Sequence, residues 1–148
     1  MLIKSAEMKR LSAIVYLHCA LNNASPSTSL VKEHVGKILD LLTCFMEGHG
    51  MAGMTWPIFV AAVELDPLDD ALMVEHPRPQ AVTGRRYLLD ALHFLMGSAV
   101  TNAARTREVI IKIWNARDLT VDETDAVQDY RNDWERFASP YSGNLSLA

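Results

Sequence analysis

At the centre of the chain lies the run TWPIFVAAVEL, residues 55–65. Pro57 suits the first turn of a helix, because the N–H that proline lacks has no intrahelical partner there. Residues 58–63, which follow the proline, are apolar on every side. A helix with this pattern is buried all round, so the run predicts a helix at the centre of the fold.

Helical periodicity extends in both directions from this run. Further helices are expected over 2–21, from Ser27–Ser29 to Met46, and over 85–99, 102–117 and 127–137. Asn102 is expected to cap the helix over 102–117. On the first helix, the stripe expected to face the core consists of Ile3, Glu7, Leu11, Ile14, Val15, His18 and Leu21. The second is expected to bury Val31, Val35, Ile38, Leu39, Leu42, Phe45 and Met46. We therefore predict an all-α fold, an irregular bundle of about five to six helices in one domain spanning 1–148.

Three segments interrupt the helices. Residues 66–84 contain three prolines and the pair Asp69-Asp70, and they predict a long loop with at most one helical turn around Leu68–Val74. An acidic linker is expected over 118–129, and a surface tail over 139–148. Two interpretations of the bundle remain open: a complete domain, or part of a longer one. In the second case an apolar face of residues 2–21 would be left for further helices.

Composition and charge exclude several classes of protein. The chain is 49% hydrophobic and 22% charged, which is typical of a globular domain. Its net charge is −4, which makes it a poor binder of duplex DNA, because phosphate contacts supply most of that affinity. Residues 78–117 carry seven Arg or Lys against two acids, whereas 118–135 carry seven acids against one Arg. We interpret the basic stretch as a solvated face that pairs with its acidic neighbours. No apolar run approaches 18 residues, so no membrane span is expected.

Few residues could form a metal site. Cys19 and Cys44 are too few for a zinc cluster, and we expect two buried, reduced thiols. His18 and Cys19 are adjacent and would point about 100° apart on a helix, so His34, Cys44 and His49 would have to complete a set that lacks tight ligand pairs. Asp66, Asp69 and Asp70 lack the pattern of a calcium loop and are interpreted as a solvated acidic turn. No cofactor or metal is therefore assigned to this chain.

No catalytic constellation is visible either. Asp90 and His93 are three residues apart and could pair on one helix, but the sequence places no nucleophile or second acid near them. An enzyme is therefore not predicted, although a deep polar pocket around these two residues would reopen that hypothesis. Trp56, Trp114 and Trp134 are expected to pack between helices, with an exposed protein-binding patch as the alternative.

Several motifs, in this order and spacing, resemble the C-terminal helical regulatory region of fungal binuclear zinc cluster transcription factors. Trp56-Pro57 with Phe59 is similar to the first of these motifs, and the acidic turn 64–67 follows it. Trp114-Asn115-Ala116-Arg117-Asp118 is similar to a Trp-x-x-Arg-Asp run that closes the region. The aromatic stretch around Trp134 and the Pro- and Ser-containing end are also similar. The resemblance covers most of the chain.

This resemblance implies a nuclear regulator of RNA polymerase II transcription. The family's six-cysteine DNA-binding module is absent from this sequence, so zinc and DNA would be bound only through such a module elsewhere. The expected partners are proteins: the regulator's own upstream region, coactivators or a second copy. The motif positions Trp56, Pro57, Phe59, Trp114, Arg117, Asp118 and Trp134 are expected to be mostly structural. The alternative is a standalone helical interaction module that binds a partner through its tryptophan-bearing faces.

Overall fold

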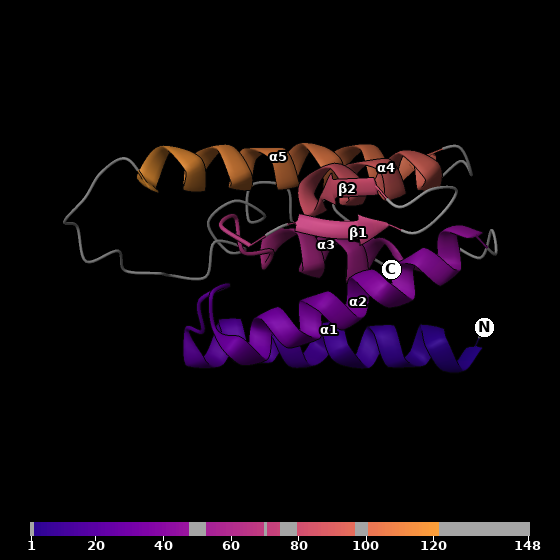
Figure 1. Ribbon diagram of the computed structural model, residues 1–148, viewed down its shortest axis with the longest axis horizontal. Coiled ribbons are helices and arrows are strands. Elements are labelled where there is room, and N and C mark those ends of the chain that lie inside the picture. Colours follow the sequence, from indigo (N-terminus) through magenta and orange to yellow (C-terminus); the bar gives the residue numbers. More distant parts are fainter. Residues whose placement is uncertain (1, 48–52, 70, 75–79, 97–100, 122–148) are drawn as a thin grey trace.

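The computed structural model describes residues 2–47, 53–69, 71–74, 80–96 and 101–121. Over these ranges the chain forms five helices and one two-stranded sheet (Figure 1). In chain order they are α1 (Leu2–Asn22), α2 (Ser29–Glu47), α3 (Thr55–Val63), β1 (Ala71–Val74), β2 (Gln80–Thr83), α4 (Gly84–Met96) and α5 (Thr101–Val121). The predicted all-α fold is confirmed, because helices make up nearly all of this structure.

The helices are arranged in three layers. Figure 1 shows the α1–α2 pair on one side, the α4–α5 pair on the other, and α3 between them. The short helix α3 contacts all four of the longer helices. The fold is therefore two helical hairpins packed on a shared central helix.

The central position of α3 confirms the prediction made from its sequence. Ile58 and all four residues of 60–63 have no exposed surface, and Phe59 is only 1% exposed. Burial of each of the larger side chains of α3 contributes on the order of 1.5–3 kcal/mol to stability. These side chains are Ile58, Phe59, Val60 and Val63. The outer helices complete the core with Val35, Ile38 and Leu42 of α2, Leu88 and Leu92 of α4, and Ile110 and Ile113 of α5. The predicted buried face of α2 is correct except for Met46, which is partly buried.

The predicted face of α1 is wrong in part. Its buried residues are Met8, Leu11, Ser12, Val15 and Cys19. Ile3 and Leu21 of the predicted stripe are 86% and 74% exposed, and Leu17 is also exposed. The reason is that α1 carries apolar side chains around most of its circumference, so periodicity alone does not select the face that packs. The buried Ser12 is accommodated because its hydroxyl donates to the Met8 carbonyl at 2.8 Å.

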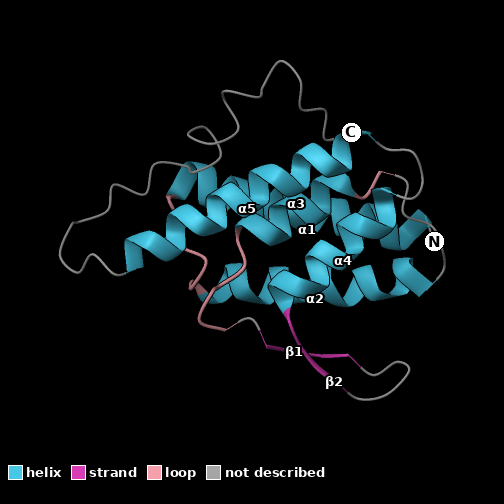
Figure 2. Cartoon of the chain, turned by 90° about the horizontal axis from the view of Figure 1, so that it is seen from above, coloured by secondary structure: helices cyan, strands magenta, loops and turns pink. Residues whose placement is uncertain are grey.

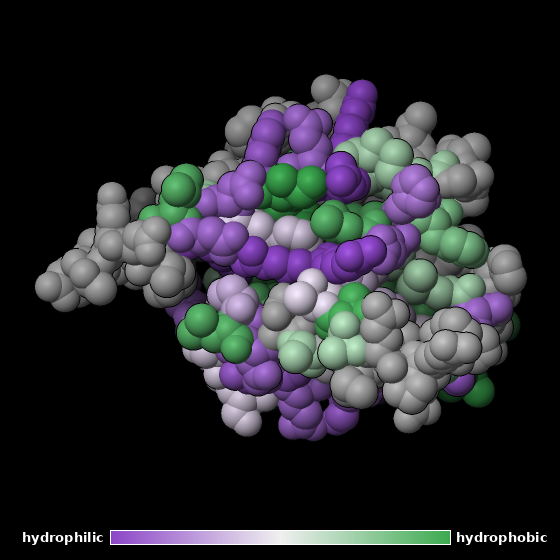
Figure 3. All heavy atoms as spheres, turned by 45° about the horizontal axis from the view of Figure 1, so that its top comes forward, coloured by the Kyte–Doolittle hydropathy of each residue, from purple (hydrophilic) through white to green (hydrophobic). Residues whose placement is uncertain are grey.

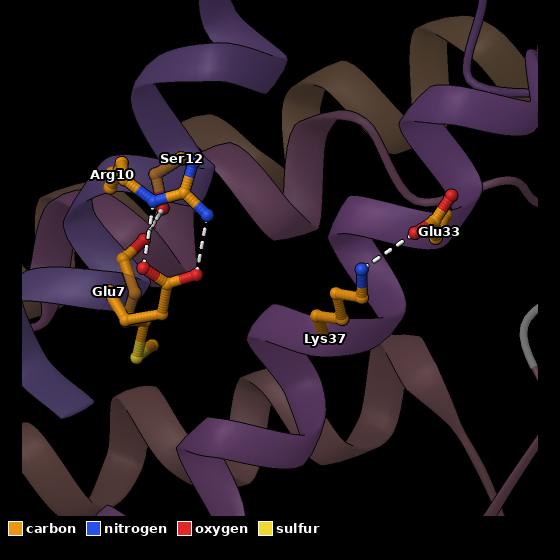
Figure 4. A network of polar contacts seen from close by, with 6 residues as sticks. Glu7, Arg10, Ser12, Glu33 and Lys37 are labelled. Atoms are coloured by element: carbon orange, nitrogen blue, oxygen red, sulfur yellow. Dashed lines mark hydrogen bonds and ion pairs between the residues drawn. The ribbon is translucent and has the colours of Figure 1, made fainter.

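The turn between α1 and α2 and their outer surfaces follow local rules. Asn23 ends α1 with a φ of 49°, a conformation that asparagine tolerates better than most residues. Both helices carry an exposed ion pair on their surface: Arg10 lies 2.6 Å from Glu7 on α1, and Lys37 lies 2.6 Å from Glu33 on α2 (Figure 4). Such solvated pairs contribute little to stability, so the two helices are held by their buried faces.

The long loop predicted over 66–84 is wrong in its second half. Residues 71–74 and 80–83 form an antiparallel hairpin, in which Ala71 pairs with Thr83 and Val74 with Gln80. No helical turn covers 71–74. The hairpin projects from the bundle (Figure 2). The two strands could not be recognised in the sequence, because four residues are too few to show the alternation of apolar and polar side chains, and prolines and aspartates surround them. Thr83 also caps α4, since its hydroxyl accepts the Arg86 N–H at 3.3 Å.

The C-terminal boundaries also differ from the prediction. Helix α5 begins at Thr101, so Asn102 lies in its first turn and does not cap it. It also continues to Val121, four residues beyond the predicted end of this helix at residue 117. The rest of that linker, the helix predicted over 127–137, Trp134 and the tail 139–148 lie outside the described residues. Along the part of the chain that the structure describes, no helix has the length and apolarity of a membrane span.

Candidate functional site

The two motifs singled out in the sequence meet at the C-terminal end of α3. The last carbonyls of a helix have no intrahelical partner and need one when they are buried. The indole N–H of Trp114 donates to the Ala62 carbonyl at 2.7 Å, and the Arg117 guanidinium donates to the carbonyl of Val63. Because Trp114 and Arg117 are three residues apart on α5, they lie on one helix face. The second motif is therefore the cap of the helix that the first motif builds.

A buried charge follows directly after this cap. Glu64 is 3% exposed, and its carboxylate lies 4.0 Å from the Arg117 guanidinium. A carboxylate at the C-terminal end of a helix is unfavourable, because the helix dipole is negative there. Arg117 thus serves two roles. It donates a hydrogen bond to the Val63 carbonyl, and its positive charge lies next to the negative carboxylate of Glu64.

Cys19 of α1 lies beside the same carboxylate. Burial raises the pKa of the Cys19 thiol well above its ordinary value, and the charge of Glu64 raises it further. The thiol is therefore protonated and unreactive near neutral pH. This places α1, α3 and α5 in contact at one point, and it agrees with the prediction of a buried, reduced Cys19. Cys44 is only partly buried.

The aspartate of the second motif fixes α4 to α5. Arg85 of α4 donates two hydrogen bonds to Asp118, each of 2.7 Å. These bonds lower the pKa of Asp118. The Arg85 guanidinium carbon also lies 5.2 Å from the centre of the Trp114 ring, in a cation–π arrangement. Trp114, Arg117 and Asp118 therefore each bind a different group around the end of α3.

The first motif packs on α1. Trp56 meets Tyr16 edge-to-face, with ring centroids 5.5 Å apart, and it stacks on Phe59 at 6.5 Å. Pro57 is buried in the first turn of α3, as predicted. Trp114 is 6% exposed, and Trp56 is partly buried. These two indoles pack between helices, as the first of the two sequence interpretations has it.

The acidic turn after α3 is tied to α2. Lys32 lies 2.8 Å from Asp66 and 3.2 Å from Asp69. Its hydrogen bond lowers the pKa of Asp66, which also accepts the Leu68 N–H at 3.0 Å. Among the described residues, no group of three or more His, Cys, Asp or Glu could hold a metal ion. The turn is therefore an anchor between α2 and α3, and Asp66 is buried rather than solvated.

Asp90 and His93 line an open hollow on the outer side of α4 and α5. Its volume is about 490 Å³, and its lining is Arg86, Leu89, Asp90, His93, Met96 and Arg107. Asp90 is 64% exposed, and Arg86 reaches it only at 4.0 Å. Among the residues that the structure describes, the lining contains no serine, cysteine, threonine or lysine that could act as a nucleophile. The hollow is an open surface groove around Asp90 and His93.

One comparison with known proteins identifies the family. The model of the fungal specific transcription factor domain matches residues 1–148. The chain belongs to that family. No curated protein and no solved structure matches the chain. The resemblance inferred from the two tryptophan motifs is thereby confirmed, and the fungal specific transcription factor domain makes the chain part of a fungal transcription regulator.

Trp114, Arg117 and Asp118, together with their partners at the end of α3 and on α4, form the junction of this transcription factor domain. The sequence indicated these three residues but not their partners. Arg85 had no signal beyond being one of several arginines in a basic stretch. Cys19 was expected to be buried and Glu64 lay in the acidic turn 64–67, but the sequence did not indicate that these two side chains meet, because they come from segments distant in sequence. The motif position Trp134 lies outside the described residues.

Proposed function

We propose that this chain is the regulatory region of a fungal transcription factor that acts in the nucleus on RNA polymerase II transcription. In this proposal, DNA is bound through a zinc cluster module that this sequence does not contain. The bundle regulates activation through packing within the protein, effector binding or contact with coactivators. It requires no cofactor of its own and acts through protein contacts.

One observation carries the proposal. The residues that distinguish the family motifs, Trp114, Arg117 and Asp118, are engaged in holding α5 to α3 and α4. They build a scaffold, in which the Trp114 indole N–H, the Arg117 guanidinium and the Asp118 carboxylate are each hydrogen-bonded to another residue. A chain with a net charge of −4 also favours protein partners over the phosphates of DNA.

The alternative is a standalone interaction module that binds partners through its tryptophan-bearing faces. Burial of Trp114 counts against this hypothesis, because a buried indole cannot supply a binding patch. A standalone module would have to use another surface.

A reporter assay tests the proposal. The chain is fused to an unrelated DNA-binding domain, at either end, and reporter output in a fungal cell is compared with that of the DNA-binding domain alone at equal protein levels. We expect a change of several-fold in at least one orientation. An Arg117→Ala fusion should behave differently, because it releases α5 from α3. Leu119→Ala, at an exposed position of the same helix, is the matched control. Equal output from all fusions and from the DNA-binding domain alone would refute the proposal.

A further inference from the structure

The groove between α4 and α5 has the character of a site for an acidic, amphipathic helix. Leu89 and Met96 give it an apolar strip, while the guanidinium groups of Arg86 and Arg107 and the imidazole of His93 lie along its edges. Within the described ranges, Asp90 is the one acid in its lining. Hydrophilic and hydrophobic side chains alternate over the face that carries these two helices (Figure 3). A ligand that suits this surface needs acidic groups beside apolar ones.

The positive charges of the groove are poorly matched. Arg86 is 79% exposed and approaches Asp90 only at the limit of an ion pair, 4.0 Å. Neither Arg107 nor His93 forms an ion pair with any other residue that the structure describes. In contrast, Arg85, one residue before Arg86, is paired through two bonds with Asp118. The first acid of the acidic segment 118–135 thus already binds α4, next to the start of the groove.

The rest of that segment has the complementary pattern. Tyr130, Trp134 and Phe137 recur at i, i+4 and i+7 and would form one stripe of a helix over 127–137. Asp129 and Asp133 precede the first two aromatic residues by one position each and would form the adjacent stripe, which ends at Arg136, three residues after Asp133. An acidic stripe beside an aromatic stripe matches cations beside an apolar strip.

The dimensions also agree. The predicted helix 127–137 and the stretch Arg86–Met96 of α4 are each eleven residues long, which is about 15 Å of helix. The described chain ends at Val121, one turn after Asp118 and therefore beside the Arg86 end of the groove. The six steps from Val121 to Val127 can reach about 20 Å when extended, which is enough for the chain to turn back.

We propose that residues 122–137 fold back onto the outer side of the bundle and occupy the α4–α5 groove. Asp129 and Asp133 would face Arg86, His93 and Arg107, and the aromatic side chains would cover Leu89 and Met96. The exposed apolar face of α1 is a poorer site for this segment. Its Arg10 is already bound by Glu7 through two bonds of 2.6 and 2.7 Å. This inference does not depend on the function proposed above.

Hydrogen exchange of the full chain, followed by mass spectrometry, tests the inference. The amides of 127–137 should exchange at least about tenfold more slowly than an unstructured segment would. The double variant R86E/R107E should return them to the unstructured rate. Adding D129R/D133R to that variant should restore the protection, because the charges are then exchanged across the groove. The matched control is R10E/K37E, which makes the same change in net charge on exposed pairs of α1 and α2.

Unaltered exchange in α3 would show that each variant keeps the fold. The inference is overturned if 127–137 is unprotected in the unmodified chain, or if its protection survives in R86E/R107E. Loss of protection in L17D/L21D but not in R86E/R107E would place the segment on α1 instead. Protection that disappears on dilution would identify a second copy of the chain as the donor of the segment. Either result would overturn the proposal that the segment docks on its own groove.

Discussion

The indole N–H of Trp114 and the carbonyl oxygen of Ala62 are joined by a hydrogen bond of 2.7 Å, across 52 positions of sequence. This bond satisfies a carbonyl that α3 itself cannot satisfy, at a residue with no exposed surface. It converts two separate sequence motifs into one structural unit.

Replacing Trp114 with phenylalanine should lower the free energy of unfolding by about 1–3 kcal/mol. The ring remains apolar, but the Ala62 carbonyl then lacks its donor in a buried position. Urea denaturation followed by far-UV circular dichroism measures the change. Leu119→Ala, at a position 73% exposed, should shift the midpoint by much less. Equal stability of Trp114→Phe and the unmodified chain would contradict the capping role.

Replacing Arg117 with methionine should destabilise the fold more strongly, by about 3–5 kcal/mol. The reason is that the buried Glu64 would lose the guanidinium that lies 4.0 Å from its carboxylate. Combining Arg117→Met with Glu64→Gln should recover part of this loss, because the uncompensated charge is then removed. A double-mutant cycle in urea measures the coupling. Additive effects of the two substitutions would show that the two side chains do not interact.

Stability should fall as the pH rises above about 9. The pKa of Cys19 is raised in the folded protein, so above the ordinary thiol pKa the unfolded chain binds fewer protons than the folded chain does. The contribution is complete below the unfolded value and is lost progressively as the pH climbs toward the folded one. Cys19→Ala should flatten this decline between pH 8 and 10.

Cys19 should also resist alkylation by iodoacetamide at pH 8 until the chain is unfolded. Rapid labelling of the native protein would contradict its burial.

Thr106→Val should stabilise the protein by about 1–2 kcal/mol. Within the part of the chain that the structure describes, the Thr106 hydroxyl is the buried side-chain oxygen that lacks a hydrogen-bond partner. Valine has nearly the same shape and removes the cost of burying that group. Thermal unfolding by calorimetry would show the gain as a higher Tm. Thr55→Val, at another buried threonine, is the comparison. A lower Tm for Thr106→Val would imply that the hydroxyl has a partner in solution.

Much of the bundle could be predicted from the sequence, because helix periods and helix ends are local. The central position of α3 followed from six apolar residues after Pro57, and the buried face of α2 followed from its spacing. The family followed from Trp56 and Trp114 with their neighbours. The hairpin at 71–83 could not be predicted, because two strands of four residues are too short for alternation to stand out among prolines. The face of α1 could not be predicted either, because two of its faces are apolar.

The sequence by itself determined most of the helices, since apolar period, proline position and turn residues act within a few positions of the chain. It also indicated Trp114, Arg117 and Asp118 through the family motif, but not Arg85 or Glu64. Tertiary structure alone decided what those residues bind. Trp114 and Arg117 carry N–H donors that need acceptors, but only the packing of α5 against α3 selected the carbonyls of Ala62 and Val63 as those acceptors. Arg85 needed an acid, and only the α4–α5 contact supplied Asp118. Capping and pairing are set by distance in space, which a one-dimensional pattern does not contain.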